Sequence, residues 1–459
     1  MKSSSNKWLR DLKRILPPNE ICLEPSLLSA YSGDKWFAAH APDAVALPRD
    51  TKSVSKILEF ANRHKIPVTP RGGGYGYVGG CVPVRGGIVL SLERMNRILE
   101  ISARDFVAVV QPGVNTQKLQ DAVERKGLFY PPDPASRANN FIGGNIATSA
   151  GGPRCLKYGV TRDYVLGLEV VLAGGEILRL GGRVHKNKTG FDLVKLFVGS
   201  EGLLGVITEA TLKLIPLPPF RATLAAGFGA MGDAVHALQA ILGAGFLPGA
   251  LELADQFTLA AAAQYTRSNR LGVCKAHLIV ELDGQEKSVR GELPVVEKII
   301  RRFKPQFVER GFGGDECEKV WQIRREFSFS LRASGLTKLN QDVVVPRGKL
   351  ENFFAFAAHL QRKSRLPVAC FGHAGDGNIH ANIMVDYGQP GARRRSEAAV
   401  DALFRWVLAH GGAITGEHGI GLAKKRWWPL AVSKEVRDLH RAIKRTLDPN
   451  GILNPGKFV

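Results

Sequence analysis

Two short segments in the second half of the chain place histidines beside glycines and acidic residues. The stretch FGHAGDGNIH holds His373 and His380, and GEHG holds Glu417 and His418. Glycine lacks the side chain that would keep a ligand or a neighbouring strand at a distance. Two imidazoles and a carboxylate form a donor set that suits Zn²⁺, Mn²⁺ or Fe²⁺, with coordination positions left open. From the residues alone, a pair of hydrogen-bonded core histidines is the alternative to a metal site.

The spacing of these two histidines calls for a turn or a bulge. They are seven residues apart, an odd number that would place them on opposite faces of one uninterrupted strand. The intervening segment Gly375–Asn378 has the composition of a turn or bulge. Such a segment can bring both imidazoles to one side.

Three glycine-rich loops occur in the first half of the chain. They are PRGGGYGYVGG at 70–80, NNFIGGNIATSAGG at 139–152 and FVGSEGLLG at 197–205. Loops of this kind let backbone N–H groups close on a phosphate. Neither the Rossmann fingerprint nor the Walker motif is matched, so each loop by itself could be a flexible turn. Three of them in one domain are difficult to explain as turns alone.

The elements around these loops predict a mixed fold. SVSKILEFANRHKIP places Val54, Ile57, Leu58 and Ala61 at helical spacing. Asn115 is positioned to cap a second helix, in NTQKLQDAVERKGL. Short β-rich runs lie between and after these helices without strict alternation, which favours an α+β fold over a doubly wound sheet.

A proline cluster, LIPLPP at 214–219, predicts a domain boundary, because prolines resist continuing either a helix or a strand. Beyond it, we expect strands in ATLAAGFG, KAHLIVELDG and ACFGHAGDGNIHANIMV. We expect helices in AVHALQAIL, ELPVVEKIIRRF and SEAAVDALFRWVLAHG. A second α+β domain therefore follows the prolines.

The chain is strongly basic, with 63 Lys+Arg against 42 Asp+Glu and a net charge of +21. Such an excess can indicate nucleic acid, an anionic membrane or acidic partners. The basic residues are spread along the chain, with short clusters only at 393–395 and 424–426, and no nucleic-acid-binding module accompanies them. We interpret the excess as a solvated basic surface that could dock an acidic partner or anionic lipid, and we expect no nucleic-acid partner.

The six cysteines are widely scattered without a C-x-x-C pair, which argues against an iron–sulfur cluster, a zinc ribbon or a disulfide framework. No apolar run approaches the roughly 20 residues of a membrane-spanning helix, and the first residues lack the apolar core of a signal peptide. We therefore expect a cytoplasmic protein, with peripheral attachment to the inner face of the membrane as the alternative.

Longer segments resemble the FAD-linked D-2-hydroxyacid dehydrogenase and oxidase family, which includes glycolate oxidase FAD subunits, D-lactate dehydrogenases and D-2-hydroxyglutarate dehydrogenases. The match runs from Trp36 to the end and rests on PPDP, KYGVTRDYVLGLEVV, GFDLVKLFVGSEG and LDPNGILNPGK. The resemblance implies an N-terminal helical segment over 1–36 and a two-part FAD-binding domain over 37–217, of the vanillyl-alcohol oxidase and p-cresol methylhydroxylase type. An α+β cap domain with an antiparallel sheet would occupy 218–459, its last residues returning to the FAD domain.

The resemblance also implies FAD, with its pyrophosphate in the glycine loops. Tyr75 stands where berberine-bridge-type relatives carry a flavin-linking histidine, so we expect non-covalent FAD. Tyr75 and Tyr77 replace Thr and Leu of many relatives, and Leu203 replaces a frequent Thr; the bulky rings could seal the flavin or alter its access to oxygen. The implied FAD-binding residues are Arg71, Gly72, Gly73, Gly74, Tyr75, Gly76, Pro132, Asp133, Gly143, Gly144, Asn145, Thr148, Gly151, Gly152, Tyr158, Gly159, Glu201, Gly205, Val206, Ile207 and Asn454.

In metal-dependent members of the family, the positions of His373, His380 and Glu417 hold a divalent cation, and that of His418 is the catalytic base. The implied reaction oxidises a D-2-hydroxy acid, such as glycolate or D-lactate, to the 2-oxo acid by hydride transfer to flavin N5. The cation would lower the pKa of the substrate hydroxyl, and His418 would remove its proton.

The segment WQIRREFSFSLRASGLTKLNQDVVVP resembles the part of the family that holds the substrate. The corresponding residues are Arg324, Ser328 and Lys338, and the planar fork of an arginine suits a carboxylate. Gln341 departs from the acid found here in many relatives, which bears on the identity of the substrate.

Two other functions stay open from the sequence. One is the redox-neutral alkyl transfer of alkyl-dihydroxyacetone-phosphate synthase, which uses FAD on the same scaffold. The other is a non-catalytic, basic surface-binding protein, which would purify without flavin. For the oxidoreductase, the electron acceptor could be a quinone, a cytochrome, a flavoprotein or an iron–sulfur partner subunit, and a homodimer is compatible with the resemblance.

Overall fold

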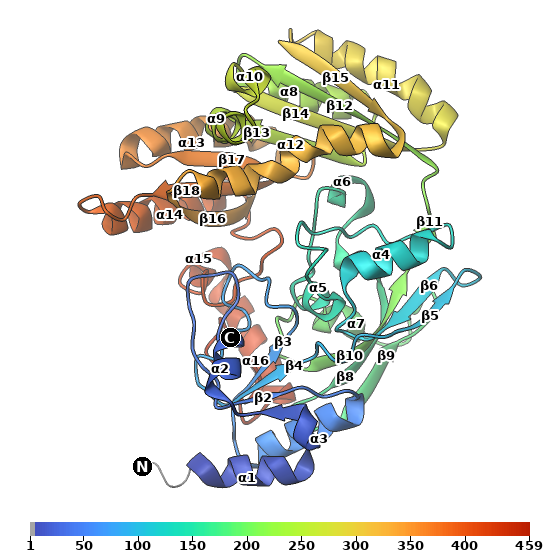
Figure 1. The fold of residues 1–459 in the computed structure, drawn as a ribbon, viewed down its shortest axis with the longest axis vertical. Coiled ribbons are helices and arrows are strands. Elements are labelled where there is room, and N and C mark those ends of the chain that lie inside the picture. The colour runs from blue at the N-terminus through green and yellow to red at the C-terminus, as the bar shows by residue number, and fades with distance from the viewer. Residues whose placement is uncertain (1–4) are drawn as a thin grey trace. The chain divides into compact units, whose positions relative to one another are not determined.

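The computed structural model describes residues 5–459, which form two compact units (Figure 1). The first unit contains Met1–Gly151, Val160–Leu217 and Glu417–Val459, and the second contains Gly152–Gly159 and Pro218–Gly416. Of the helical segment expected over 1–36, residues 1–4 lie outside the described part. The described part of that segment contains α1 (Ser5–Ile15), η1 (Pro18–Glu20), β1 (Ile21–Cys22) and α2 (Pro25–Ala30).

A four-stranded sheet in the first unit has the order β1-β2-β4-β3. Its strands β2 (Ala44–Ala46), β4 (Ile88–Ser91) and β3 (Val68–Arg71) are parallel, and β1 is antiparallel to β2. Helix α3 (Thr51–Arg63) is preceded by Asp50, whose side chain accepts a hydrogen bond from the Ser53 N–H, as expected of an N-cap.

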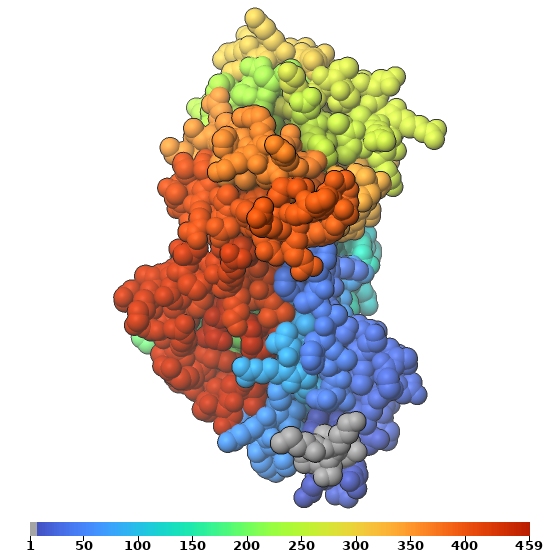
Figure 2. Space-filling model, turned by 90° about the vertical axis from the view of Figure 1, so that its left-hand side faces the viewer, coloured from blue at the N-terminus to red at the C-terminus, as the bar shows by residue number. Residues whose placement is uncertain are grey.

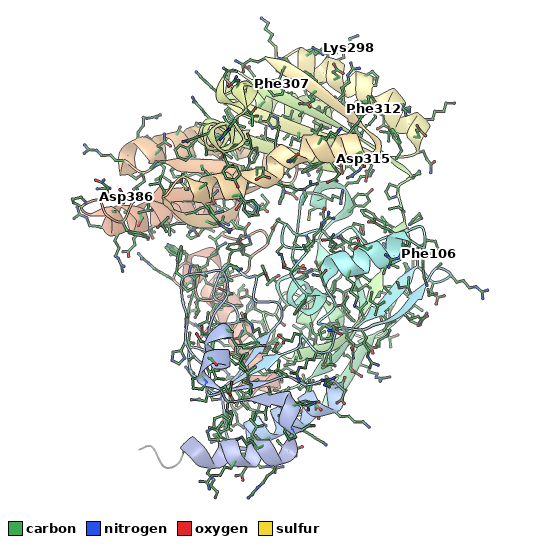
Figure 3. The ribbon with its side chains drawn as sticks, in the orientation of Figure 1. Phe106, Lys298, Phe307, Phe312, Asp315 and Asp386 are labelled. Carbon is green, nitrogen blue, oxygen red and sulfur yellow. The ribbon has the colours of Figure 1, made fainter. Side chains whose placement is uncertain are left out.

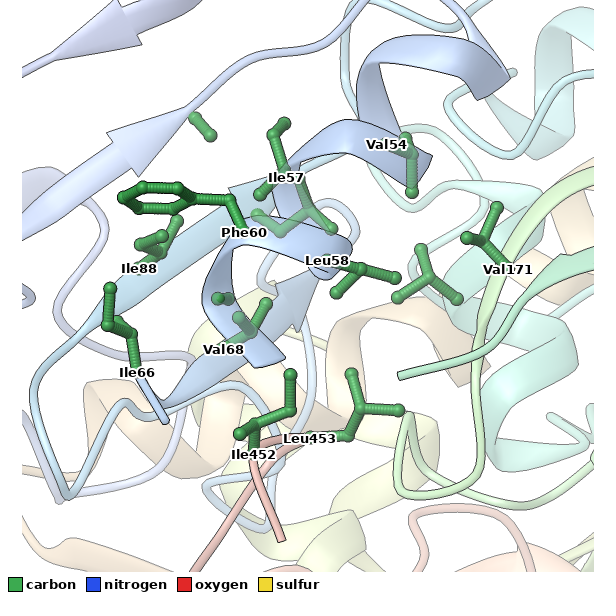
Figure 4. Close-up of a cluster of buried hydrophobic side chains, with 14 of the residues drawn as sticks. Val54, Ile57, Leu58, Phe60, Ile66, Val68, Ile88, Val171, Ile452 and Leu453 are labelled. Atoms are coloured by element: carbon green, nitrogen blue, oxygen red, sulfur yellow. The ribbon is translucent and has the colours of Figure 1, made fainter. Parts of the chain in front are cut away.

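The apolar stripe predicted for α3 is confirmed. Val54, Ile57, Leu58 and Ala61 are all fully buried. They pack into a cluster with β3, β4 and, from the far end of the chain, Ile452 and Leu453 (Figure 4). The C-terminal residues therefore help to close the core from which β3 leads into the first glycine loop.

A second sheet in the first unit has five antiparallel strands in the order β5-β6-β10-β8-β9. Asn115 caps α4 as predicted, because its side chain accepts a hydrogen bond from the Lys118 N–H. The strands of this sheet are β5 (Ile98–Ser102), β6 (Val107–Val110), β8 (Val165–Val171), β9 (Ile177–Gly181) and β10 (Val206–Lys213). The other elements in this part of the chain are α4 (Thr116–Glu124), β7 (Leu128–Phe129), α5 (Ile142–Thr148), η2 (Thr161–Tyr164), α7 (Leu193–Phe197) and β11 (Ile215–Pro216).

The second unit is built on a seven-stranded sheet in which every paired strand is antiparallel, as predicted. Its order is β15-β12-β14-β13-β17-β18-β16. The strands are β12 (Phe220–Phe228), β13 (Ala250–Asp255), β14 (Ala276–Gly284), β15 (Phe307–Phe312), β16 (Thr337–Val344), β17 (Val368–His373) and β18 (Asn378–Val385).

The helices of the second unit are α6 (Cys155–Tyr158), α8 (Met231–Gly243), α9 (Gln256–Thr266), α10 (Asn269–Gly272), α11 (Glu286–Arg301), α12 (Gly313–Ala333), η3 (Arg347–Lys349), α13 (Leu350–Ser364) and α14 (Ala392–Ala409). Strand β15, at the edge of the sheet, contains Phe307 and Phe312 (Figure 3). The guanidinium of Arg270 lies 4.5 Å from the centroid of the Phe307 ring, and that of Arg290 lies 5.5 Å from the centroid of the Phe312 ring. The two arginines come from helices, Arg270 from α10 and Arg290 from α11.

The C-terminal segment of the first unit contains α15 (Trp428–Ala431) and α16 (Lys434–Leu447). It then forms a parallel bridge between Leu453 and Val68, and the Asn454 N–H donates to the Val68 carbonyl at 2.7 Å. Figure 2 shows the red C-terminal residues beside blue residues from the N-terminal part of the chain. The chain end therefore lies next to the strand that enters the first glycine loop.

One part of the predicted basic surface is corrected by the structure. In the cluster at 424–426, Lys425 and Arg426 are exposed, but Lys424 is buried. The six cysteines, Cys22, Cys81, Cys155, Cys274, Cys317 and Cys370, are free thiols. Over residues 5–459, none of the helices has the length and apolar character needed to cross a bilayer.

Candidate active site

The segment with two histidines is a β-hairpin, which confirms the predicted turn. β17 ends at His373 and β18 begins at Asn378, directly opposite it in the antiparallel pair. Gly377 in the turn has φ +87°, and a Cβ at this position would overlap the Val345 carbonyl oxygen. The two imidazole centroids are 5.5 Å apart, with the rings nearly perpendicular at 83°. Both rings therefore lie on one side of the hairpin.

His373, His380 and Glu417 can each offer one ligand atom, and these atoms all lie within 4.8 Å of one another. Glu417 follows Gly416, the last residue of the second unit. The donor set of two imidazoles and one carboxylate fits a divalent transition metal and leaves coordination positions open.

Asp342 on β16 fixes the chain just before Glu417. Its Oδ2 accepts hydrogen bonds from Thr415 Oγ1 and the Gly416 N–H, both at 2.9 Å. Its Oδ1 accepts one from Asn378 Nδ2 at 2.7 Å. A Cβ on Gly416 would overlap Asn378 Nδ2, so only glycine allows this close packing. One buried carboxylate thus joins the hairpin to the segment that carries Glu417.

Glu252 on β13 is a site residue that the sequence analysis missed. Its side chain is buried; Oε1 lies 2.5 Å from His373 Nδ1, and Oε2 accepts a hydrogen bond from Arg324 Nε at 2.5 Å. Burial opposes its ionisation, but His373 and Arg324 outweigh that effect and lower the pKa of Glu252 to about 2. The only signal in the sequence is an acid within the apolar run ALELAD.

The three predicted substrate residues lie together. Arg324 and Ser328 are four residues apart on α12, which places them on one helix face. Lys338 on β16 donates from Nζ to Ser328 Oγ at 2.7 Å. The Arg324 guanidinium lies over the Phe371 ring, 4.8 Å from its centroid. Burial, together with the charges of Arg332 and Arg324, lowers the pKa of Lys338 to about 8.

His418, the predicted base, packs against a residue of the first glycine loop. Its ring centroid lies 5.2 Å from that of Tyr77. Beyond His418, the backbone N–H groups of Ile420 and Gly421 donate to the Glu201 carboxylate, each at 2.8 Å. Burial raises the pKa of Glu201, against the effect of these hydrogen bonds. Glu201, predicted to bind the cofactor, thus uses its side chain to hold the loop that follows His418.

The first two glycine loops pack backbone to backbone in the first unit. A Cβ on Gly72 would lie 3.4 Å from the N and Cα atoms of Gly144, and one on Gly73 would lie 2.8 Å from the Asn139 carbonyl. A Cβ on Gly143 would lie 2.6 Å from Pro112, whereas a Cβ on Gly144 meets no atom within 4 Å. The open space beside Gly144 would let a diphosphate approach the backbone closely.

Asn454 has an unsatisfied acceptor close to these loops. Its Nδ2 donates to the carbonyls of Gly80 at 2.9 Å and Glu201 at 2.8 Å. Its buried Oδ1 has no hydrogen-bond partner within residues 5–459. Buried polar atoms are rarely left unsatisfied, so this oxygen fits a ligand that brings a donor.

The other predicted FAD residues divide between the two units. Gly152, Tyr158 and Gly159 belong to the second unit, where Tyr158 Oη donates to Asp283 Oδ2 at 2.6 Å. The first unit holds Arg71, Gly74, Tyr75, Gly76, Pro132, Asp133, Asn145, Thr148, Gly151, Gly205, Val206 and Ile207.

Several members of the set in the first unit engage the protein itself. Asn145 Nδ2 donates to Thr116 Oγ1 at 2.8 Å, and the Pro132 carbonyl accepts from Gln120 Nε2 at 3.0 Å. Val206 packs into the core around α3. Lys35 Nζ lies 4.7 Å from the centroid of the Tyr75 ring.

Comparison with known proteins bears on both units. Residues 217–458 match the family of FAD linked oxidases, C-terminal domain, and residues 42–181 match an FAD binding domain. The chain is 41% identical to glycolate oxidase subunit GlcD of Bacillus subtilis (strain 168), over 91% of this chain and 89% of that one. It is 34% identical to D-lactate dehydrogenase of Anaerostipes hadrus, over 96% of this chain and 95% of that one.

The predicted fold type is confirmed by a solved structure. The chain superimposes on p-cresol methylhydroxylase with a TM-score of 0.82, over 100% of this chain and 97% of the other, at 22% sequence identity. At this level of sequence identity, the similarity supports a shared fold and not a shared function.

Proposed function

The chain belongs to the FAD-linked oxidases and is an FAD-dependent oxidoreductase, and from its site we propose that it oxidises a D-2-hydroxy acid to the 2-oxo acid. The observation that carries this proposal is the Glu252 carboxylate, which contacts both His373 and Arg324. A metal-ligand set and a guanidinium joined in this way suit a substrate with a hydroxyl and a carboxylate on adjacent carbons. The acids in the names of the two relatives, glycolate and D-lactate, share this arrangement.

In this proposal the carboxylate of the acid is bound by Arg324 and Lys338. Arg324 makes one hydrogen bond within residues 5–459, through Nε, so its two terminal nitrogens are available for a planar carboxylate. Lys338 is held by Ser328 and adds a second positive charge. Both cations lie in the second unit.

His418 accepts the hydroxyl proton as the C–O bond of the acid becomes a carbonyl. The hydrogen on C2 leaves with its electron pair, so the product is the 2-oxo acid. FAD, when bound, supplies the acceptor for that hydride at N5. A divalent cation held by His373, His380 and Glu417 would lower the pKa of the substrate hydroxyl.

We assign the glycine loops containing Gly72 and Gly144 to the FAD diphosphate, and the free acceptor of Asn454 to a donor of the same cofactor. The open space at Gly144 and the buried Oδ1 of Asn454 support this assignment. The binding is non-covalent, because Tyr75 offers no imidazole for a link to the flavin.

The visible spectrum of the purified protein tests the proposed reaction. Glycolate, D-lactate and D-2-hydroxyglutarate are added in turn under anaerobic conditions, and one of them should bleach the flavin band. A His418→Ala variant should keep its flavin and lose the bleaching. A flavin that none of the acids bleaches would overturn the proposed substrate class and favour alkyl transfer.

Metal dependence is tested on the same sample. Incubation with a chelator, followed by its removal, should abolish bleaching while FAD stays bound, and Zn²⁺ or Mn²⁺ should restore it. Full bleaching by a chelated protein shown to be free of metal would contradict the role assigned to the cation.

A further inference from the structure

We propose that Glu252 is a positioning residue that fixes the metal ligand His373 and the substrate arginine Arg324 with one carboxylate. This inference rests on the proposed function, because it concerns the same metal and the same acid. It goes beyond the proposed function because it gives a role to Glu252, which need not contact the metal or the acid.

The position of Glu252 in the sheet makes it a rigid support. β13 lies between β14 and β17, and Glu252 stands opposite Ile279 on one side and His373 on the other. Its relative exposure is 2%. The backbone of a central strand is held by hydrogen bonds to both neighbouring strands, and the Glu252 side chain is held by its contacts with His373 and Arg324.

The contact with His373 selects the nitrogen that faces a metal. Glu252 Oε1 lies 2.5 Å from Nδ1 of the imidazole, which leaves Nε2 as the ligand atom. A carboxylate on the far nitrogen of a ligating histidine sets its tautomer and ring orientation and makes it a better donor.

The contact between Glu252 and Arg324 fixes the orientation of the guanidinium. Glu252 Oε2 accepts from Nε at 2.5 Å, and the Phe371 ring supports the group, 4.8 Å from its centre. With Nε engaged, the outer edge with both terminal nitrogens is presented to a carboxylate. The orientation of the cation site and that of the arginine thus depend on one residue.

A buried counter-ion with a purely structural role would explain the same contacts, so the test needs a matched control. Glu297 on α11 is also buried, at 3% exposure, and its carboxylate also bridges two side chains. Arg301 Nη2 and Arg310 Nε lie 2.6 and 2.5 Å from it. None of these three residues has a role in the proposed reaction.

The experiment measures the binding of Zn²⁺ alone to the FAD-loaded, metal-stripped protein, for wild type, Glu252→Gln and Glu297→Gln. The amide can accept from one partner only and turns an NH₂ group toward the other. We expect Glu252→Gln to weaken Zn²⁺ binding about 10- to 100-fold and to raise the KM for the acid. Glu297→Gln should leave the Zn²⁺ affinity unchanged, whatever it does to thermal stability.

The outcomes separate this inference from the proposed function. If wild type binds no Zn²⁺, the metal role fails and this inference falls with it. If wild type binds and Glu252→Gln binds equally well, the positioning role alone is overturned. Should Glu252→Gln not fold, Glu252→Asp decides, because it keeps the charge but is too short to reach both partners. Wild-type Zn²⁺ affinity in that variant would also overturn the inference.

Discussion

Tyr77 lies against His418, with the ring centroids 5.2 Å apart and the ring planes inclined by 31°. The tyrosine belongs to the first glycine loop, so the loop assigned to the cofactor also supports the predicted base. Small displacements of a catalytic group can cost orders of magnitude in rate. The ring of Tyr77 is therefore expected to matter for catalysis.

We predict that Tyr77→Ala lowers the rate of anaerobic flavin reduction about tenfold, because His418 loses the surface that orients it. Tyr77→Phe keeps the ring and should react faster than Tyr77→Ala. Stopped-flow measurement of flavin bleaching compares the two variants. Equal rates in Tyr77→Ala and wild type would show that the contact does not orient the base.

The hairpin that carries His373 and His380 depends on Gly377. We predict that Gly377→Ala lowers the free energy of unfolding by about 3 kcal/mol or more, because φ is +87° and the new Cβ would overlap the Val345 carbonyl oxygen. Gly335, at φ +77° with no atom near a Cβ, is the matched control. Gly335→Ala should cost only about 1–2 kcal/mol, the penalty for the left-handed backbone.

Urea unfolding gives both values, and Zn²⁺ binding should be lost in Gly377→Ala alone. Similar losses of stability in the two variants would mean that the turn can relax around the added methyl group.

Local patterns in the sequence predicted much of this fold. The stripe from Val54 to Ala61, the Asn115 cap and the turn at Gly375–Asn378 each depend on residues close together in the chain, and each is confirmed. The antiparallel sheet of the second unit came from the family resemblance and is also confirmed. Periodicity and turn composition are local signals, and these elements contain them.

The contacts that tie the site together could not be predicted in this way. Glu252 lies 121 residues from His373 and 72 from Arg324, and only the order of strands in the sheet brings the three together. Asp342 likewise reaches Thr415 and Gly416 across the fold. Lys424, which looks like part of a basic surface in the sequence, is buried by tertiary packing.

Lys338 should give the reaction an alkaline limit. Its pKa is lowered to about 8, first by burial and then by the charges of Arg332 and Arg324. Above that pH the free enzyme loses a positive charge proposed to bind the substrate carboxylate, so kcat/KM should fall as pH rises through about 8. Lys338→Arg stays protonated, so its kcat/KM should not fall as pH rises through about 8. If kcat/KM of the variant still falls above about pH 8, another group causes the decrease.

His277 on β14 should make the stability of the protein depend on pH. It is buried, its Nε2 has no hydrogen-bond partner within residues 5–459, and burial lowers its pKa from 6.5 to about 4. Between these values the unfolded chain binds the proton that the folded chain rejects, so stability falls as pH falls from 6.5 to 4. A difference of this size corresponds to about 3 kcal/mol.

Asp255 acts with the opposite sign and must be separated from His277. Burial raises its pKa to about 6, so between pH 3.8 and 6 the folded chain holds a proton that the unfolded chain releases, and stability falls as pH rises. Urea unfolding of wild type and His277→Leu from pH 4.5 to 7.5 removes this shared contribution by difference. The free energy of unfolding of wild type, relative to that of the variant, should fall as pH falls, because the leucine has no proton to exclude. A constant difference across the range would mean that His277 is protonated to the same extent in the folded and unfolded chains.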